Sequence, residues 1–162
     1  MEILCLKLNL WVNKMNRLDK KYMELAVEIG LQTNCSREDR KVGAVIVKNG
    51  KILSKATNYI PEELKSNCAN CCYRKANNIP SGTCMEKCFA LCAEQHAIAE
   101  ALKKGEDLSG ATIYVTLSPC AICARWIVFV GIKRVVFLNE YNDEFSRNIL
   151  TKAKVKIESI KL

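Results

Sequence analysis

The sequence lacks a secretory leader, a membrane-spanning run, an internal repeat and a low-complexity segment. Its first ten residues are fairly apolar, but Glu2, Lys7 and Asn9 interrupt any continuous hydrophobic stretch, which excludes a signal peptide or a membrane anchor there. We therefore expect a cytoplasmic protein with no membrane contact. In a reducing compartment its ten cysteines stay available to bind metal instead of forming the disulfides of a small secreted scaffold.

Compact basic blocks with interleaved aromatic residues, which single-strand nucleic-acid binders use, are also missing, and aromatic residues make up only 7% of the chain. The formal net charge of +8 still favours an anionic partner, either a phosphorylated small molecule or nucleic acid. Because the lysines are scattered over predicted helix faces and turns, where they keep a domain soluble, a nucleic-acid partner is possible but not favoured.

With 162 residues, 49% of them hydrophobic and 26% charged, the chain is long enough to bury the core of one ordinary domain. We expect an N-terminal extension at residues 1–18, a single domain at residues 19–162 and a cysteine-rich insert at about residues 61–88. Alternating apolar residues between Leu4 and Val12 predict a short extra strand, unless the true start is Met15.

Hydrophobic periodicity predicts helices and strands that alternate after an opening hairpin. Asn49-Gly50 is a strong signal for the hairpin turn. The expected helices cover residues 19–31, 93–104, 120–130 and 143–153, and the expected strands cover residues 42–47, 51–56, 111–117, 134–138 and 155–160. This order indicates a layered α/β domain with a mixed sheet.

Two short cysteine motifs carry the chemical signal. Cys120 and Cys123 lie one helical turn apart, where a predicted strand meets a predicted helix. Alone, this spacing is as typical of a structural zinc site or a redox pair as of a catalytic site. Cys92, at the start of another predicted helix, supplies a third ligand, and Glu94 adds a carboxylate that need not bind the metal.

Three protein ligands leave the fourth tetrahedral position of zinc for water, which is typical of a catalytic site. Water activated in this way can attack a ring carbon that bears an amino group, provided that a nearby acid/base moves protons to the ring nitrogen and to the departing ammonia. Glu94 fits that role.

The combination of Cys92-Ala93-Glu94 with Pro119-Cys120-Ala121-Ile122-Cys123 resembles the cytidine deaminase superfamily. Further segments look like its deoxycytidylate deaminase branch, namely residues 40–47, 57–61, 78–82, 111–120 and 131–137, with Tyr141 and Asp143. The resemblance covers roughly residue 19 to the C-terminus. It implies a three-layer α/β/α fold around a central mixed five-stranded sheet, and assembly into a homo-oligomer, often a hexamer.

The same resemblance implies roles for individual side chains. Glu94 would be the proton shuttle, Asn58 would contact the sugar of the substrate, and Arg40 would be a candidate contact for its phosphate. Ala93 and Ser118, which adjoin the metal-binding motifs, complete the predicted substrate site.

The sequence departs from the deoxycytidylate branch at its first metal ligand, which is normally histidine and is Cys92 here. An all-thiolate site makes the metal a weaker Lewis acid unless positive potential compensates. The N-terminal ends of the two helices, or Arg125, are candidates for that compensation.

Two further departures affect the substrate site. His96, the single histidine, stands where the branch has asparagine, and we interpret it as a packed or hydrogen-bonding residue, with a place in the site as the alternative. Tyr59 stands where the branch has glycine, and Glu62-Glu63 follow Pro61 where it has arginine. These differences leave phosphate recognition open.

The insert holds a second group of cysteines, Cys68, Cys71, Cys72, Cys84 and Cys88. Some members of the branch hold a structural zinc in this region, and four thiolates would form a closed tetrahedral site that fastens the insert. Free core cysteines and a redox pair are the alternatives, and Cys35 is a further candidate ligand.

The leading hypothesis is therefore zinc-dependent hydrolytic deamination of a cytosine nucleotide, dCMP to dUMP with release of ammonia, with one catalytic and one structural zinc. One alternative is a deaminase of a nucleoside, a purine base or a polynucleotide. The other is a zinc-binding module without catalytic activity.

Overall fold

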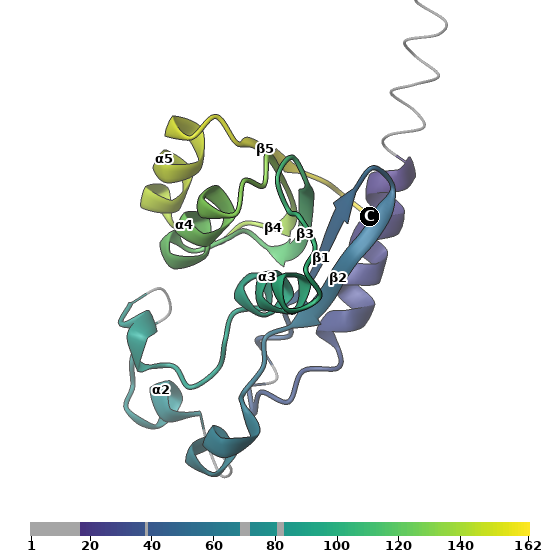
Figure 1. Ribbon diagram of the computed structural model, residues 1–162. Helices are drawn as coiled ribbons and strands as arrows, with labels where there is room; N and C mark the ends of the chain where they lie inside the picture. Colours follow the sequence, from purple (N-terminus) through teal and green to yellow (C-terminus); the bar gives the residue numbers. More distant parts are fainter. Residues whose placement is uncertain (1–16, 38, 69–71, 81–82) are drawn as a thin grey trace, which may run out of the picture.

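The computed structural model describes residues 17–37, 39–68, 72–80 and 83–162 (Figure 1). Its centre is a five-stranded mixed sheet in the order β2-β1-β3-β4-β5. Strand β1 (Gly43–Lys48) pairs antiparallel with both β2 (Lys51–Thr57) and β3 (Thr112–Leu117), and β4 (Arg134–Asn139) and β5 (Lys156–Ser159) continue the sheet in parallel. The mixed sheet predicted above is confirmed, whereas the strand expected between Leu4 and Val12 lies outside the described residues.

The hairpin between β1 and β2 turns at the expected dipeptide. Asn49 and Gly50 have φ values of 52° and 78°, and positive φ at both central residues is what a tight hairpin turn with the twist of its strands requires. The hydroxyl of Tyr22 donates to the Gly50 carbonyl at 3.1 Å, so the first helix also holds the turn.

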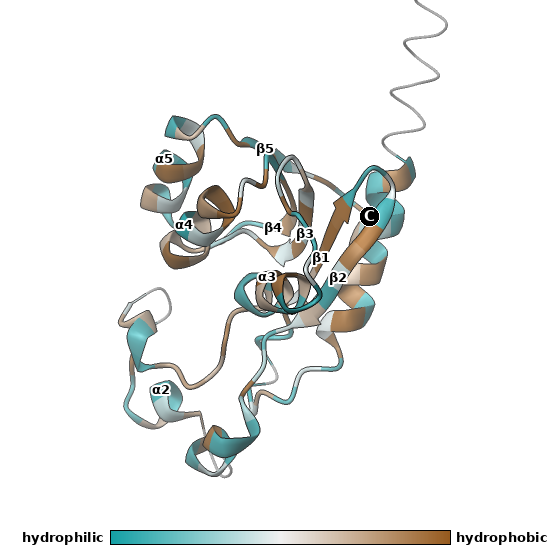
Figure 2. Cartoon of the chain, in the orientation of Figure 1, coloured by the Kyte–Doolittle hydropathy of each residue, from teal (hydrophilic) through white to brown (hydrophobic). Residues whose placement is uncertain are grey.

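Helices cover both faces of the sheet, as the predicted three-layer fold requires. The helix at residues 17–30 packs on one face, and α3 (Ala93–Lys103), α4 (Ala121–Phe129) and α5 (Glu144–Lys152) pack on the other. Alternate strand residues supply the two cores: Val45 and Tyr114 face the first helix, whereas Ile46 and Ile113 face α3 and α4. In Figure 2, β1 is predominantly hydrophobic because both of its faces are covered.

The first helix lies unusually close to β1. A Cβ atom built on Gly43 would lie only 1.9 Å from the Ala26 carbonyl oxygen, so only glycine fits where the strand passes the helix backbone.

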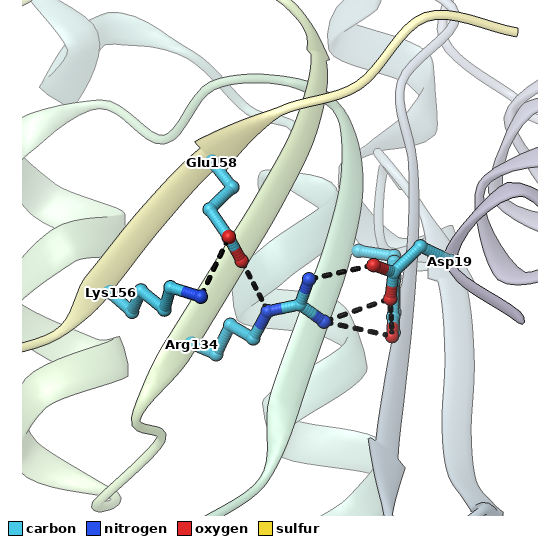
Figure 3. Close-up of polar contacts among 5 residues, drawn as sticks. Asp19, Arg134, Lys156 and Glu158 are labelled. Atoms are coloured by element: carbon cyan, nitrogen blue, oxygen red, sulfur yellow. Dashed lines mark hydrogen bonds and ion pairs between the residues drawn. The ribbon is translucent and has the colours of Figure 1, made fainter. Parts of the chain in front are cut away.

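A half-buried polar network fastens the same helix to the far strands (Figure 3). Arg134 on β4 donates to both carboxylate oxygens of Asp19, at 2.8 and 2.7 Å, and its Nε donates to Glu158 on β5. Tyr114 on β3 also donates to Asp19, at 2.6 Å. Asp19 and Arg134 are 115 residues apart in sequence, so this network joins the beginning of the described chain to its end.

The cysteine-rich insert leaves the sheet after β2 and returns at α3 (Figure 1). It contains three short helical segments, η1 (Glu62–Cys68), α2 (Tyr73–Ala76) and η2 (Met85–Lys87), joined by irregular backbone. Across the described ranges, every helix is too short or too polar to cross a bilayer.

Candidate active site

Three cysteine sulfurs converge where α3 and α4 begin. Cys92 is the residue before α3, Cys120 is the residue before α4, and Cys123 lies in the first turn of α4. Their sulfur atoms all lie within 4.8 Å of one another, and within the described ranges no other group of three such ligands is as tight. Tetrahedral zinc with bonds of about 2.3 Å would place sulfurs roughly 3.8 Å apart, so this donor set fits the ion.

Local hydrogen bonds fix the starts of the helices that carry these sulfurs. The backbone N–H of Cys92 donates to the Gln95 side chain at 3.1 Å. At the other helix, Asp143 accepts from Ala121 N–H at 2.8 Å with one carboxylate oxygen and from Ser146 N–H at 2.9 Å with the other. Asp143 therefore caps α4 and α5 together, which satisfies first-turn N–H groups of both.

Without metal, the three thiols share their protons unequally. Thiol hydrogen bonds from Cys123 and Cys92, with backbone N–H groups of the first turn of α4, lower the pKa of Cys120. The pKa values of Cys92 and Cys123 are raised, chiefly through their hydrogen bonds with Cys120. These contacts favour the thiolate form of Cys120 over those of its two neighbours, and the thiolate is the form that binds metal.

Glu94 lies beside this cluster in the first turn of α3 and is only 4% exposed. Burial raises its pKa to about 8, and the nearby Cys120 thiolate contributes in the same direction. A carboxyl group whose pKa lies near neutral pH can both hold and release a proton under working conditions.

A cavity of about 340 Å³ opens onto the cluster. It brings together most of the residues predicted from sequence, namely Cys92, Glu94 and Cys120 with the substrate candidates Asn58, Arg40, Ala93 and Ser118. The remaining wall comes largely from the segment before β1 and from the insert, including Arg37, Arg74 and Met85. Nothing in the sequence pattern placed the insert against this cavity.

The residues predicted to contact the substrate differ in how their polar atoms are already used within the protein. The side-chain oxygen of Asn58 accepts from Val42 N–H at 3.0 Å, which directs the amide NH₂ elsewhere as a donor. The Ser118 hydroxyl accepts from Tyr141 N–H at 2.6 Å and donates to the Tyr141 carbonyl at 3.2 Å. Its hydroxyl therefore holds the loop after β4 against the cavity. Arg40 lies 3.6 Å from the carboxylate of Asp39.

His96 is a packed residue. Its Nδ1 lies 2.9 Å from the Thr57 carbonyl, which can only accept, so Nδ1–H donates. The ring stacks on Tyr59 with centroids 4.9 Å apart and planes inclined by 29°. The two residues that differ from the deoxycytidylate pattern thus contact each other. Arg125, the candidate for charge compensation, is exposed, and its Nε donates to the Ala121 carbonyl.

The cysteines of the insert are spread over different environments. Cys68 and Cys72 are buried, Cys88 is half-buried and Cys84 is exposed, whereas Cys71 lies outside the described residues. Burial raises the pKa of Cys35, and the thiols of Cys72, Cys88 and Cys68 add smaller upward contributions. Cys35 therefore lies near three of the predicted second-site residues.

Residues 16–139 match the family model of the cytidine and deoxycytidylate deaminase zinc-binding region. The deoxycytidylate deaminase of Mycobacterium phage D29 is 34% identical over 124 residues, covering 75% of this chain and 94% of the phage protein.

Solved structures agree with the sequence comparison. The dCMP deaminase of cyanophage S-TIM5, crystallised with dCMP and dUMP, has a TM-score of 0.73 and 31% identity, and the match covers 89% of this chain and 97% of the phage chain. Among more distant relatives, a tRNA-specific adenosine deaminase from Aquifex aeolicus is 37% identical over 98 residues, covering 59% of this chain and 50% of that protein.

Proposed function

The chain belongs to the cytidine and deoxycytidylate deaminase family, and on that premise we propose that it deaminates dCMP hydrolytically to dUMP. The observation that supports this most directly is the three-sulfur cluster with Glu94 beside it, open to one cavity. In the reaction, water supplies the oxygen that replaces the exocyclic amino group, and ammonia leaves.

Zinc is the metal that best suits these donors, because three thiolates form a soft ligand set at tetrahedral spacing. Bound by three protein ligands, zinc supplies a Lewis acid with one position left for water, whose pKa it lowers. Cys92, Cys120 and Cys123 would hold it. The starts of α3 and α4 direct backbone N–H groups at the same sulfurs and offset part of their negative charge.

Glu94 would move the protons. A buried carboxylate accepts a proton from the attacking water and delivers protons to the ring nitrogen and to the departing amino group. Burial raises the pKa of this carboxyl group, which strengthens it as a base toward the attacking water.

The remaining cavity residues would orient the nucleotide. The amide NH₂ of Asn58 would donate to a sugar hydroxyl, because its oxygen is already bound to Val42. Ala93 and Ser118 would contribute chiefly through their backbones at the base, and Arg40 would approach the phosphate. All four residues line the same cavity.

The central experiment pairs Glu94→Gln with Glu100→Gln. Glu100→Gln is the same chemical change on the same helix, but Glu100 lies at the surface and pairs with Lys103. We expect Glu94→Gln to keep its zinc and lose ammonia release from dCMP by roughly 10²- to 10⁴-fold, whereas Glu100→Gln stays near the parent rate. Full activity in Glu94→Gln would contradict the mechanism.

A specific observation keeps a second candidate function in view, namely the similarity to a tRNA-specific adenosine deaminase together with the net charge of +8. Assaying dCMP, deoxycytidine, purines and single-stranded RNA in parallel separates the two activities. Binding to RNA that weakens steeply with salt, with deamination of the polymer, would favour the alternative. Zinc binding with no ammonia release from any substrate would identify a non-catalytic module.

We also propose a second, structural zinc in the insert. Within the predicted set of Cys68, Cys71, Cys72, Cys84 and Cys88, the proximity of Cys68, Cys72 and Cys88 to Cys35 favours these four as ligands. Because their sulfurs are not grouped as tightly as those of the first cluster, metal would draw them together. Metal analysis should find two zinc ions per chain, and Cys72→Ser should lose one. One zinc in the parent protein would contradict the proposal.

Exposed aromatic side chains support a homo-oligomer. Trp126 and Phe129 on α4 are 44% and 85% exposed, and Phe145 on the adjoining α5 is 64% exposed. Figure 2 shows α4 as predominantly hydrophobic, and an exposed apolar surface of this kind is typical of an interface. We propose that this face binds a second copy of the chain. Light scattering should show a multimer, up to the hexamer that the resemblance implied, and Phe129→Glu should shift it toward monomer.

A further inference from the structure

Arg74 is a buried cation in the wall of the active-site cavity. Only 6% of it is exposed, and it is the one lysine or arginine in the described part of the chain that is classed as buried. The residue lies in α2 of the insert, and its side chain lines the same cavity as Glu94 and Cys120.

The partners of Arg74 are all uncharged. Nη2 donates to the carbonyls of Pro80, at 2.7 Å, and Thr83, and Nη1 approaches the Met85 sulfur at 3.1 Å. Nε is shielded from solvent and has no partner, the sole such buried side-chain nitrogen or oxygen in the described residues. Because a thioether is a weak acceptor, Nε and Nη1 keep unused donor capacity.

The other two arginines of the cavity differ in this respect. Arg37 binds both oxygens of Asp39, at 3.0 and 2.6 Å, and Arg40 shares the same carboxylate. No carboxylate of the described residues forms an ion pair with Arg74. Burying a charge without a counter-ion is costly, so a ligand that brings an anion into this cavity recovers part of that cost.

We propose that Arg74 contacts the phosphate of the substrate and thereby selects the nucleotide over the nucleoside. The inference rests on the proposed deaminase function, which supplies a substrate with an anionic group at one end. The carbonyls of Pro80 and Thr83 hold the guanidinium in place, and the N–H groups of Nη1, whose protein partner is only the weakly accepting Met85 sulfur, meet the phosphate oxygens. The insert then serves the active site as its phosphate-recognition wall.

The test compares dCMP with deoxycytidine in Arg74→Gln. Charge-assisted hydrogen bonds are strong, and losing one should lower kcat/KM for dCMP roughly 10- to 100-fold, mainly through KM. For deoxycytidine, which has no phosphate, kcat/KM should change less than about 3-fold. Arg17→Gln, an exposed residue outside the cavity, makes the same change in net charge and should leave both substrates unaffected.

If Arg74 had a purely structural role, its loss would disorder the insert and lower activity toward both substrates. Equal losses for dCMP and deoxycytidine, or no loss for either, would overturn the proposal. Zinc content, measured alongside, should equal that of the parent. If Arg74→Gln does not fold, Arg74→Lys, which keeps the charge but not the planar fork, should still show a loss confined to dCMP.

The proposed function can fail separately. If the parent protein deaminates neither compound, calorimetric binding of dCMP and deoxycytidine to the same variants still tests Arg74. A preference of the parent for dCMP that disappears in Arg74→Gln supports the contact, and a preference that persists refutes it.

Discussion

The two groups of cysteines in this chain are held in opposite ways. Cys92, Cys120 and Cys123 sit at the starts of α3 and α4, helices that pack on the central sheet. The described cysteines of the insert, Cys68, Cys72, Cys84 and Cys88, lie on short helical segments and irregular backbone. The first group is organised by the core and is ready for metal, whereas the second depends on side-chain contacts such as those of Arg74, and on the metal that we propose there.

Removing a sulfur from the organised cluster should have the largest effect. Cys120→Ala takes away the sulfur that Cys92 and Cys123 contact and whose pKa is lowered, and two remaining thiols do not hold zinc tightly. We expect loss of the catalytic zinc and of at least ~10³-fold in activity, checked by metal analysis and ammonia release. An active Cys120→Ala variant with full zinc would show that the cluster is not the catalytic site.

The buried carboxyl beside the cluster should make the metal-free protein sensitive to pH. The pKa of Glu94 is about 8 in the folded chain and near 4.3 when unfolded, so its ionisation destabilises the fold as pH rises between these values. Glu94→Gln stays neutral. In chelator-treated, reduced protein its stability advantage over the parent should grow by on the order of 3 kcal/mol between pH 5 and pH 8.5.

Chemical denaturation at the two pH values measures this difference, and Glu100→Gln is again the control. If the difference in unfolding free energy between Glu94→Gln and the parent were the same at both pH values, Glu94 would not be buried as a neutral acid.

Asp143, which caps both α4 and α5, tests how far the starts of these helices support the cysteine cluster. Asp143→Ala removes acceptors from the first turns of α4 and α5, and each lost cap costs about 1 kcal/mol. We expect the free energy of unfolding to fall by roughly 2 kcal/mol and zinc to be released at lower chelator concentrations. Asp143→Asn, which keeps one acceptor oxygen, should recover part of both. Unchanged zinc retention in the alanine variant would separate the cap from the metal site.

The smallest effect is expected in the insert, at Cys84. This residue is exposed, and surface substitutions usually change stability by no more than about 0.5 kcal/mol. Cys84→Ser should therefore keep the parent's unfolding midpoint, zinc content and activity. Loss of a zinc ion in this variant would place Cys84 among the ligands of the second site instead of Cys35.

The same contrast explains what could be predicted from the sequence. The elements of the sheet and its helices were predicted to within about two residues. The strand β1 is a short, continuous apolar run that ends at a turn signal, and the buried positions of α3 repeat at helix spacing. The three cysteines that cluster in the structure, and Glu94 beside them, were predicted as a site because their motifs lie at helix starts, where local sequence determines the geometry. Their roles as metal ligands and proton shuttle stay predictions.

The insert was located but its role was missed. Arg74 and Met85 carry no periodic pattern, and their place in the cavity wall depends on long-range folding of an irregular segment. Likewise, the stacking of His96 on Tyr59 joins residues 37 positions apart, which spacing alone cannot relate. Sequence reasoning thus predicted which residues gather around the three sulfurs, and it missed the part of the cavity wall that the insert forms.

The ion pair between Asp19 and Arg134 has a consequence for biosynthesis. During translation the helix at residues 17–30 is synthesised early, and Arg134 follows Asp19 by 115 residues. Until β4 is made, the apolar side of that helix, with Tyr22 and Met23, lacks packing partners such as Val136. We therefore expect the helix to dock fully only after both cysteine motifs have been synthesised.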